Sequence, residues 1–188
     1  MKHIKESLIF FVLLSCFVSY VSGQEKDSTI LPVPFDPEIE KIVYQEVVQE
    51  EGTKLEFFYR AVNWLNNTYS NPVAVTSVRD PNTGKIVGNY RFRVYQDAEE
   101  EEDVRKWETI LYSFTLEFRE GRYRYTFDNF LLKTRSRYPI ENWLQELEEG
   151  DPSYWSDKLK KFDEHIQGLI NSLKESMKAE EVIEEESW

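Results

Sequence analysis

Five arginines in two short stretches of this chain have side chains that could bind an anion. Arg91 and Arg93 alternate with apolar residues, and Arg119, Arg122 and Arg124 surround a glycine further on. A guanidinium group donates paired hydrogen bonds to a carboxylate or a phosphate. The sequence therefore suggests a binding surface for an anionic ligand or an acidic partner. The alternative interpretation is a solvated sheet face, neutralised by nearby carboxylates such as Glu117 and by an acidic loop.

Carboxylates that could work as an acid and base pair are the second candidate chemistry. Glu46, Glu117 and Asp128 lie on or near predicted strands, where a glycosidase would hold its two catalytic carboxylates. Nothing in the sequence brings two of them together, and Glu117 has another expected partner in Arg124. A hydrolase is therefore only the alternative hypothesis.

The sequence contains few of the residues that nucleophilic or metal-dependent catalysis would need. Cys16 is the only cysteine, and His165 is the only histidine outside the N-terminal stretch. The chain has no Gly-x-Ser-x-Gly, no His-Glu-x-x-His and no phosphate-binding glycine loop. The acidic run Asp97–Asp103 lacks the ligand spacing and glycine of an EF-hand, so we expect a solvated loop there. We predict no catalytic residue, no metal ligand and no cofactor.

The N-terminus has the pattern of an export signal. Lys2 and Lys5 precede an apolar run at residues 7–21, which ends in small residues at Gly23. We expect cleavage after Gly23; the alternative is a lipoprotein acylated on Cys16. Removing residues 1–23 changes the formal net charge from −12 to −13 and leaves no stable membrane span. A chain this acidic is repelled by phosphate backbones, so we expect no nucleic-acid partner.

The first half of the remaining chain predicts a strand, a helix and two further strands. The strand covers about residues 42–49, and Thr53 with Glu56 has the spacing of a capping box. The helix after it is expected to bury a face made of Leu55, Phe58, Tyr59, Val62 and Leu65, widened by Ala61 and Trp64. The stretches PVAVTSVRD and KIVGNYRFRVYQ flank a turn and read as strands; in the second, Asn89, Arg91 and Arg93 share one face.

Residues 108–132 have the strongest hairpin pattern of the chain. A two-residue turn at Glu120–Gly121 would place Phe118 opposite Tyr123, Leu116 opposite Tyr125 and Phe114 opposite Phe127 on the dry face. On the wet face the same register pairs Glu117 with Arg124 and Thr115 with Thr126. The alternation of Arg and Tyr in this stretch is thus explained by sheet geometry alone.

The C-terminal part predicts a short helical turn, a linker and an amphipathic helix with Ser156 as its N-cap. Its apolar stripe is Leu159, Phe162, Ile166, Leu169, Ile170, Leu173 and Met177. This stripe either packs on the sheet of its own chain or pairs with a second copy, so the protein is expected to be a monomer or a homodimer through this helix.

The chain resembles a family of exported bacterial proteins described as a domain of unknown function with a TBP-like fold, after the TATA-box-binding protein. The resemblance rests on Tyr44 and Val47, LEFFYRAVNWL, Gly84 with IVG, the hairpin YSFTLEFREGRYRYTFDNF, and HIQGLINSLKESMK. It implies an α+β fold: a curved antiparallel sheet of about five strands, in the order β-α-β-β-β-β-α, with helices on one face. It implies no activity, and the name of the fold is no evidence that the protein binds DNA.

These observations give one domain and one preferred function class. We expect a signal peptide at 1–23, a flexible lead at 24–38, the TBP-like domain at 39–179 and a disordered acidic tail at 180–188. The protein is predicted to be a non-enzymatic binding or interaction module in the periplasm or cell envelope of a Gram-negative bacterium. Its partner would be an envelope protein or an anionic ligand. The alternative is a small-ligand carrier or hydrolase with a pocket between sheet and helices.

Overall fold

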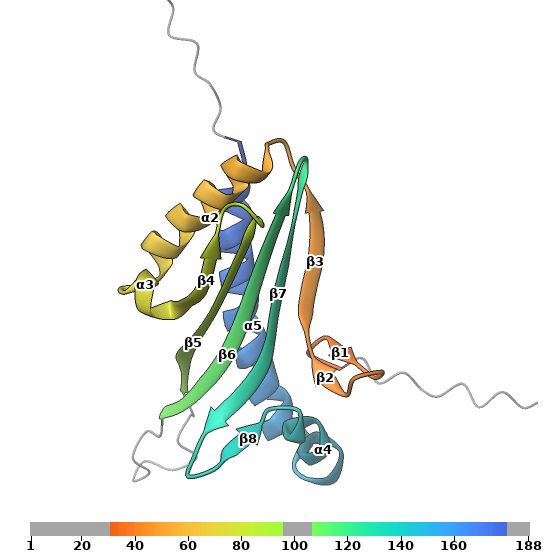
Figure 1. Ribbon diagram of the computed structural model, residues 1–188. Coiled ribbons are helices and arrows are strands. Elements are labelled where there is room, and N and C mark those ends of the chain that lie inside the picture. Colours follow the sequence, from red (N-terminus) through yellow and green to blue (C-terminus); the bar gives the residue numbers. More distant parts are fainter. Residues whose placement is uncertain (1–30, 96–106, 180–188) are drawn as a thin grey trace, which may run out of the picture. The chain divides into compact units, whose positions relative to one another are not determined.

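A computed structural model of the chain describes residues 31–95 and 107–179 (Figure 1). The expected signal peptide, Cys16, the acidic run Asp97–Asp103 and the acidic tail at 180–188 lie outside these residues. Part of the expected lead is described: β1 (Phe35–Asp36) pairs with β2 (Lys41–Ile42) in a small hairpin, and Val33 beside it is buried.

The centre of the structure is an antiparallel sheet of six strands (Figure 1). Its order is β3-β7-β6-β5-β4, and β8 pairs with the far end of β7. The strands are β3 (Tyr44–Gln49), β4 (Thr76–Asp80), β5 (Lys85–Tyr95), β6 (Trp107–Arg119), β7 (Arg122–Lys133) and β8 (Arg137–Pro139). The predicted α+β class and TBP-like arrangement are confirmed.

The sheet has one strand more than the five that the sequence predicts. The additional strand is β8, whose three residues pair with Leu131, Leu132 and Lys133. A strand of this length contains too few residues to show an alternating pattern, and Pro139 at its end is typical of a turn. The sequence therefore predicts a helical turn and a linker from Tyr138 onward rather than a strand.

The β6–β7 hairpin has the predicted register. Glu117 lies opposite Arg124, and Phe118 lies opposite Tyr123, which fixes every further pair as far as Ser113. Gly121 has φ +70°, a conformation that glycine adopts without the steric cost of a Cβ atom, and this closes the two-residue turn. The predicted dry residues of β7 are buried: Tyr123, Tyr125 and Phe127.

The helix α2 (Lys54–Thr68) begins with the predicted capping box and buries a face that agrees with the predicted one in part. Thr53 accepts a hydrogen bond from the amide of Glu56, whose carboxylate accepts one from the amide of Thr53. The buried residues are Phe57, Phe58, Ala61, Trp64 and Leu65. Leu55 and Tyr59, expected inside, are exposed by 46% and 61%. Apolar residues surround much of this helix, so helical spacing alone did not define the edges of the buried face.

Residues 72–75 form a helical turn rather than the start of a strand. Asn71 accepts a hydrogen bond from the amide of Ala74 at 3.2 Å, which caps the turn α3 (Pro72–Val75). The strand β4 therefore begins only at Thr76. The prediction of a strand over the whole stretch was wrong because a short apolar run such as PVAV does not distinguish a strand from a helical turn.

The last helix, α5 (Pro152–Met177), follows a short helix α4 (Asn142–Glu149). Its N-cap is Asp151, whose carboxylate accepts from the amides of Ser153 and Tyr154, so the predicted cap at Ser156 was wrong. Lys158 is only 8% exposed. Its ammonium group lies 2.9 Å from Glu108 and 4.2 Å from the ring centroid of Trp143, which ties α5 to β6 and α4.

The helices α2 and α5 cover one face of the sheet, and the opposite face is uncovered by any described helix (Figure 1). The apolar stripe of α5 is buried in the chain's own core, so a dimer through it would have to displace the sheet. Aromatic rings fill the space beneath the sheet; Phe114, Phe127, Phe130 and Phe162 are fully buried. The strand face that carries these rings thus determines which side chains point to solvent.

Gly88 allows β5 to pass close to its neighbours, which gives a stability prediction. A Cβ atom there would lie 2.3 Å from the ring of Phe114 and 2.8 Å from the carbonyl oxygen of Val75. We expect Gly88→Ala to lower the free energy of unfolding by about 1–3 kcal/mol, as overpacking does. The matched control is Gly168→Ala in α5, where a Cβ atom meets nothing within 4 Å. It should raise the stability by about 0.5–1 kcal/mol. Urea unfolding measures both, and equal effects would contradict the packing argument.

Candidate functional site

The five predicted arginines all lie exposed on the uncovered face of the sheet, but in two separate groups. Arg119, Arg122 and Arg124 lie at the β6–β7 turn. Arg91 lies opposite Leu111, six residues along β6 from Glu117, the partner of Arg124. At the rise of an extended strand this separates the two groups by about 20 Å. They do not form one binding surface.

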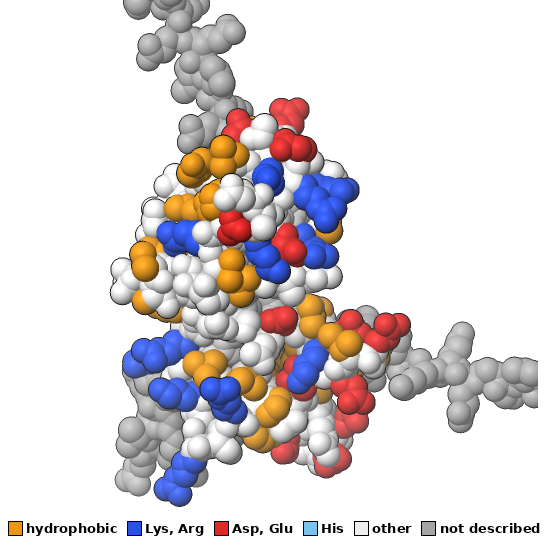
Figure 2. All heavy atoms as spheres, viewed as in Figure 1, with side chains coloured by type: hydrophobic (Ala, Val, Ile, Leu, Met, Phe, Trp, Pro, Cys, Tyr) orange, Lys and Arg blue, Asp and Glu red, His pale blue; other side chains and the backbone are white. Residues whose placement is uncertain are grey.

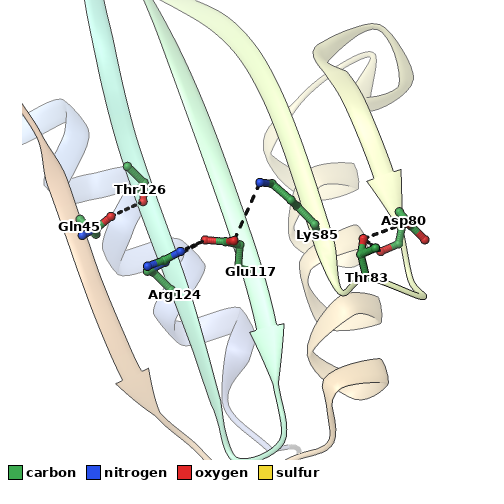
Figure 3. A network of polar contacts seen from close by, with 7 residues as sticks. All are labelled: Gln45, Asp80, Thr83, Lys85, Glu117, Arg124 and Thr126. Atoms are coloured by element: carbon green, nitrogen blue, oxygen red, sulfur yellow. Dashed lines mark hydrogen bonds and ion pairs between the residues drawn. The ribbon is translucent and has the colours of Figure 1, made fainter.

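At the turn, one arginine is already neutralised within the sheet (Figure 3). Nε of Arg124 donates to Glu117 at 2.8 Å, and Lys85 lies 3.9 Å from the same carboxylate. In the next row, Thr126 donates to Gln45 at 3.0 Å. The solvated-face interpretation therefore describes Arg124 well. Arg119 and Arg122 lie directly opposite each other, a like-charge pair that costs stability.

The opposite end of the uncovered face is more uniformly cationic. We call this the basic end and define it by Arg91, Arg93, Lys133 and Arg137. Arg91, Arg93 and Lys133 line one hollow of about 390 Å³, and Arg91 and Arg137 line a second. None of the four has a carboxylate within 4.0 Å among the described residues. Figure 2 shows a lower group of Lys and Arg without Asp or Glu among them, whereas both signs mix in the upper part.

The second hollow is a pocket with a volume of about 610 Å³. It extends from the segment 70–75 across β5, β6 and β7 to Arg137 of β8. Leu111 and Leu131 line it beside Arg91, so the cationic groups stand next to apolar surface. A hollow in which polar and charged groups converge beside apolar surface is a candidate ligand site.

Three uncharged polar side chains form a row in this pocket, which we call the amide row. The hydroxyl of Ser113 donates to Oδ1 of Asn89 at 2.8 Å, and Nδ2 of Asn129 donates to Oγ of Ser113 at 3.2 Å. The row crosses the central strands β5, β6 and β7. Asn129 joins it because it is the extra residue of a bulge in β7, with φ +54°. Asparagine tolerates this left-handed conformation better than most residues.

The candidate hydrolase carboxylates do not come together. Glu46 lies on the helix-covered side of β3, where it accepts from Tyr125 at 2.7 Å and from Lys174 at 2.5 Å. Asp128 lies opposite Ser113, four residues along β6 from Glu117, which is a separation of about 13 Å. Glycosidases hold their two carboxyl groups about 5–9.5 Å apart. Burial raises the pKa of Asp128, and the hydrogen bond from Lys174 lowers the pKa of Glu46.

His165 lies on α5 and does not meet these carboxylates. Its ring stacks on Phe92 with the centroids 3.8 Å apart, and the partial burial lowers its pKa below the usual value. Among residues 31–95 and 107–179, no three His, Cys, Asp or Glu side chains are grouped as a metal site would need. The chain thus offers a polar pocket on the sheet rather than a cluster of titratable groups.

Lys133, Arg137 and the amide row were missed by sequence reasoning. One signal was available: Phe127 and Phe130 are three residues apart, which breaks the alternation of the strand and indicates a bulge between them. The bulge shifts Leu131 and Lys133 to the uncovered face. The pairing of Arg137 with Lys133 follows from β8, for which the sequence has no comparable signal.

The arrangement of the sheet and helices defines a TBP-like domain, and comparison with known proteins agrees. Residues 44–133 match the model of the family DUF4468, a domain of unknown function with a TBP-like fold. This part of the chain is therefore similar to DUF4468 domains, in agreement with the resemblance that the sequence suggested. No curated protein matches the chain.

Two solved structures show the same fold at low sequence identity. A DUF4468 family protein from Bacteroides ovatus has a TM-score of 0.64 and 12% identity, over 81% of this chain and 94% of that protein. A TBP-like protein from Parabacteroides distasonis has a TM-score of 0.58 and 16% identity, over 78% of this chain and 97% of that one. At these identities the likeness shows the fold alone. Within the described residues, no helix is long and apolar enough to cross a bilayer.

The contacts of Glu46 predict how stability depends on pH. Because the folded-state pKa of Glu46 is depressed, its ionised form stabilises the fold above the unfolded pKa, and this contribution is lost as the pH falls through the folded pKa. Glu46→Gln should therefore be less stable than the wild type at pH 7, by at most about 1 kcal/mol for so exposed a pair. The gap should narrow as the pH falls below the ordinary pKa of a glutamate and close once Glu46 is protonated in the folded protein. Glu148→Gln, at an exposed position of α4, is the control. A gap independent of pH, measured by urea unfolding, would contradict this assignment.

Proposed function

We propose that the protein is a non-enzymatic binding module that takes up an anionic ligand at the basic end of the uncovered face. The observation that supports this most directly is the gathering of four cations without a described carboxylate partner. The whole chain has 35 acidic residues against 23 basic ones, so neutralising partners are abundant elsewhere. A bound anion would relieve the mutual repulsion of these cations and accept their hydrogen bonds.

The other hypotheses have weaker support. A carrier or hydrolase with its pocket between sheet and helices would need space where aromatic side chains are packed. A nucleic-acid partner is disfavoured by the net charge of −12. Of the five arginines first suggested, Arg91 and Arg93 belong to the proposed site. Arg124 is paired with Glu117, and Arg119 and Arg122 lie at the other end.

Charge reversal at the two ends of the face tests this proposal. Arg91→Glu combined with Arg137→Glu should weaken binding of inorganic phosphate and of citrate by tenfold or more, measured by NMR titration of the full-length mature protein. The matched control, Arg119→Glu with Arg122→Glu, changes the net charge equally but about 20 Å away. It should retain nearly the wild-type affinity. Both variants should keep the melting temperature within a few degrees, because all four side chains are exposed.

The outcome depends on the difference between the two double variants. Equal weakening by both would show a general charge effect rather than a site at the basic end. Undiminished binding in the Arg91 and Arg137 variant would overturn the proposal directly. Raising the ionic strength should also weaken the wild-type binding, since exposed charges are screened.

We further propose that the protein acts in the cell envelope after export. The support is the basic start, apolar run and small residues at 1–23. Mass spectrometry of the protein recovered from its native cells should show a mature chain that begins at Gln24. A chain that begins at an acylated Cys16 would instead identify a lipoprotein, and an intact Met1 would contradict export.

A further inference from the structure

We propose that the pocket at the basic end selects anions that also carry hydroxyl groups, the chemistry shared by sugar acids and sugar phosphates. This inference rests on the proposed function and deepens it. The cations account for the charge of the ligand. The amide row of Asn89, Ser113 and Asn129 would form hydrogen bonds with an uncharged polar part of the ligand beside its charged group.

The hydrogen bonds within the amide row leave both donors and acceptors unused. Asn89 uses its Oδ1 to accept from Ser113, so both amide hydrogens of its Nδ2 are free for a ligand. Asn129 donates one hydrogen to Ser113, so its Oδ1 and a second hydrogen remain. None of these groups has a further partner among the described residues. A hydroxyl group is both donor and acceptor and satisfies such a mixed set, whereas a carboxylate oxygen only accepts.

The positions of the charge and of the row fit one small ligand. Arg91 follows Asn89 by two residues on the same face of β5, so their Cα atoms are about 7 Å apart. Arg137 approaches from β8 on the other side of the pocket. A compact molecule with an anionic group at one end and hydroxyl groups along its body therefore reaches both kinds of partner at once.

Part of the remaining wall is apolar, which suits the carbon framework of such a molecule. Leu111 and Leu131 lie in the same row of the sheet as Arg91. Hydroxylated rings present C–H groups between their hydroxyls, and these pack on aliphatic and aromatic side chains. Figure 2 shows mainly uncharged atoms between the lower and the upper charged groups.

A matched pair of probes separates hydroxyl recognition from charge recognition. Glucuronate and cyclohexanecarboxylate both carry one carboxylate on a six-membered ring, but only glucuronate has hydroxyl groups. Glucose 6-phosphate, in a third arm, replaces the carboxylate by a phosphate and distinguishes the two sources of negative charge. NMR titration of the full-length mature protein detects even weak binding and follows the side-chain amide signals of Asn89 and Asn129.

The variants probe the row and the cations separately. Asn89→Ala should weaken the binding of glucuronate or of glucose 6-phosphate by about tenfold, the effect of losing one or two hydrogen bonds. It should leave cyclohexanecarboxylate unchanged. Ser113→Ala, which removes the hydroxyl that orients both amides, should act in the same direction. The control Asn63→Ala lies exposed on α2, away from the pocket. Arg91→Gln should weaken all three probes.

The possible results distinguish this inference from the proposed function. Hydroxylated probes that bind more tightly than cyclohexanecarboxylate, with the loss confined to Asn89→Ala and Ser113→Ala, support it. Equal binding of all probes, with sensitivity to Arg91→Gln only, overturns the hydroxyl preference and leaves the anion site intact. Absence of binding by every probe and by inorganic phosphate overturns both. Preference for either sugar acid or sugar phosphate identifies the anionic group.

Discussion

The alternation of residues across the β6–β7 hairpin is the constraint on which the remaining structure depends. Tyr123, Tyr125 and Phe127 must reach the aromatic core, so the residues between them must face solvent. A slip of one residue would place Arg122 and Arg124 beneath the helices, where an unpaired charge costs several kcal/mol or more. Packing of the core thus determines which side chains lie on the opposite face, although none of the core side chains needs to contact a ligand.

The bulge at Asn129 reverses this alternation halfway along β7. Before it, odd-numbered residues such as Phe127 are buried; after it, Phe130 and Leu132 are buried instead. The reversal keeps aromatic and aliphatic residues in the core and moves Leu131 and Lys133 to the uncovered face. It also turns Asn129 toward Ser113. One inserted residue therefore brings Asn129 and Leu131 to the pocket and Lys133 to the neighbouring hollow. Bulges commonly redirect side chains in this way.

Local sequence patterns predicted those parts of the fold whose partners are close in the chain. The two-residue turn fixed the register of β6 and β7, and Thr53 with Glu56 fixed the start of α2. The distance between Arg91 and Arg124 could not be predicted in this way, because the connection from β5 to β6 contains the run Asp97–Asp103 and sets no register. The face of α2 was equally ambiguous, since apolar residues occur nearly all round it. Hence the arginines were assigned to the right face but not divided into two groups.

The fold and the site follow different constraints on sequence. The two solved relatives share the fold at TM-scores of 0.64 and 0.58 with only 12% and 16% identity. Such conservation of architecture requires that buried positions stay apolar, whereas positions on the uncovered face need only remain compatible with water. Asn89, Arg91 and Arg137 are exposed, so packing of the core does not restrict which residues occupy these positions. A binding preference built on them is a property of this chain's own residues, and the shared fold alone does not determine it.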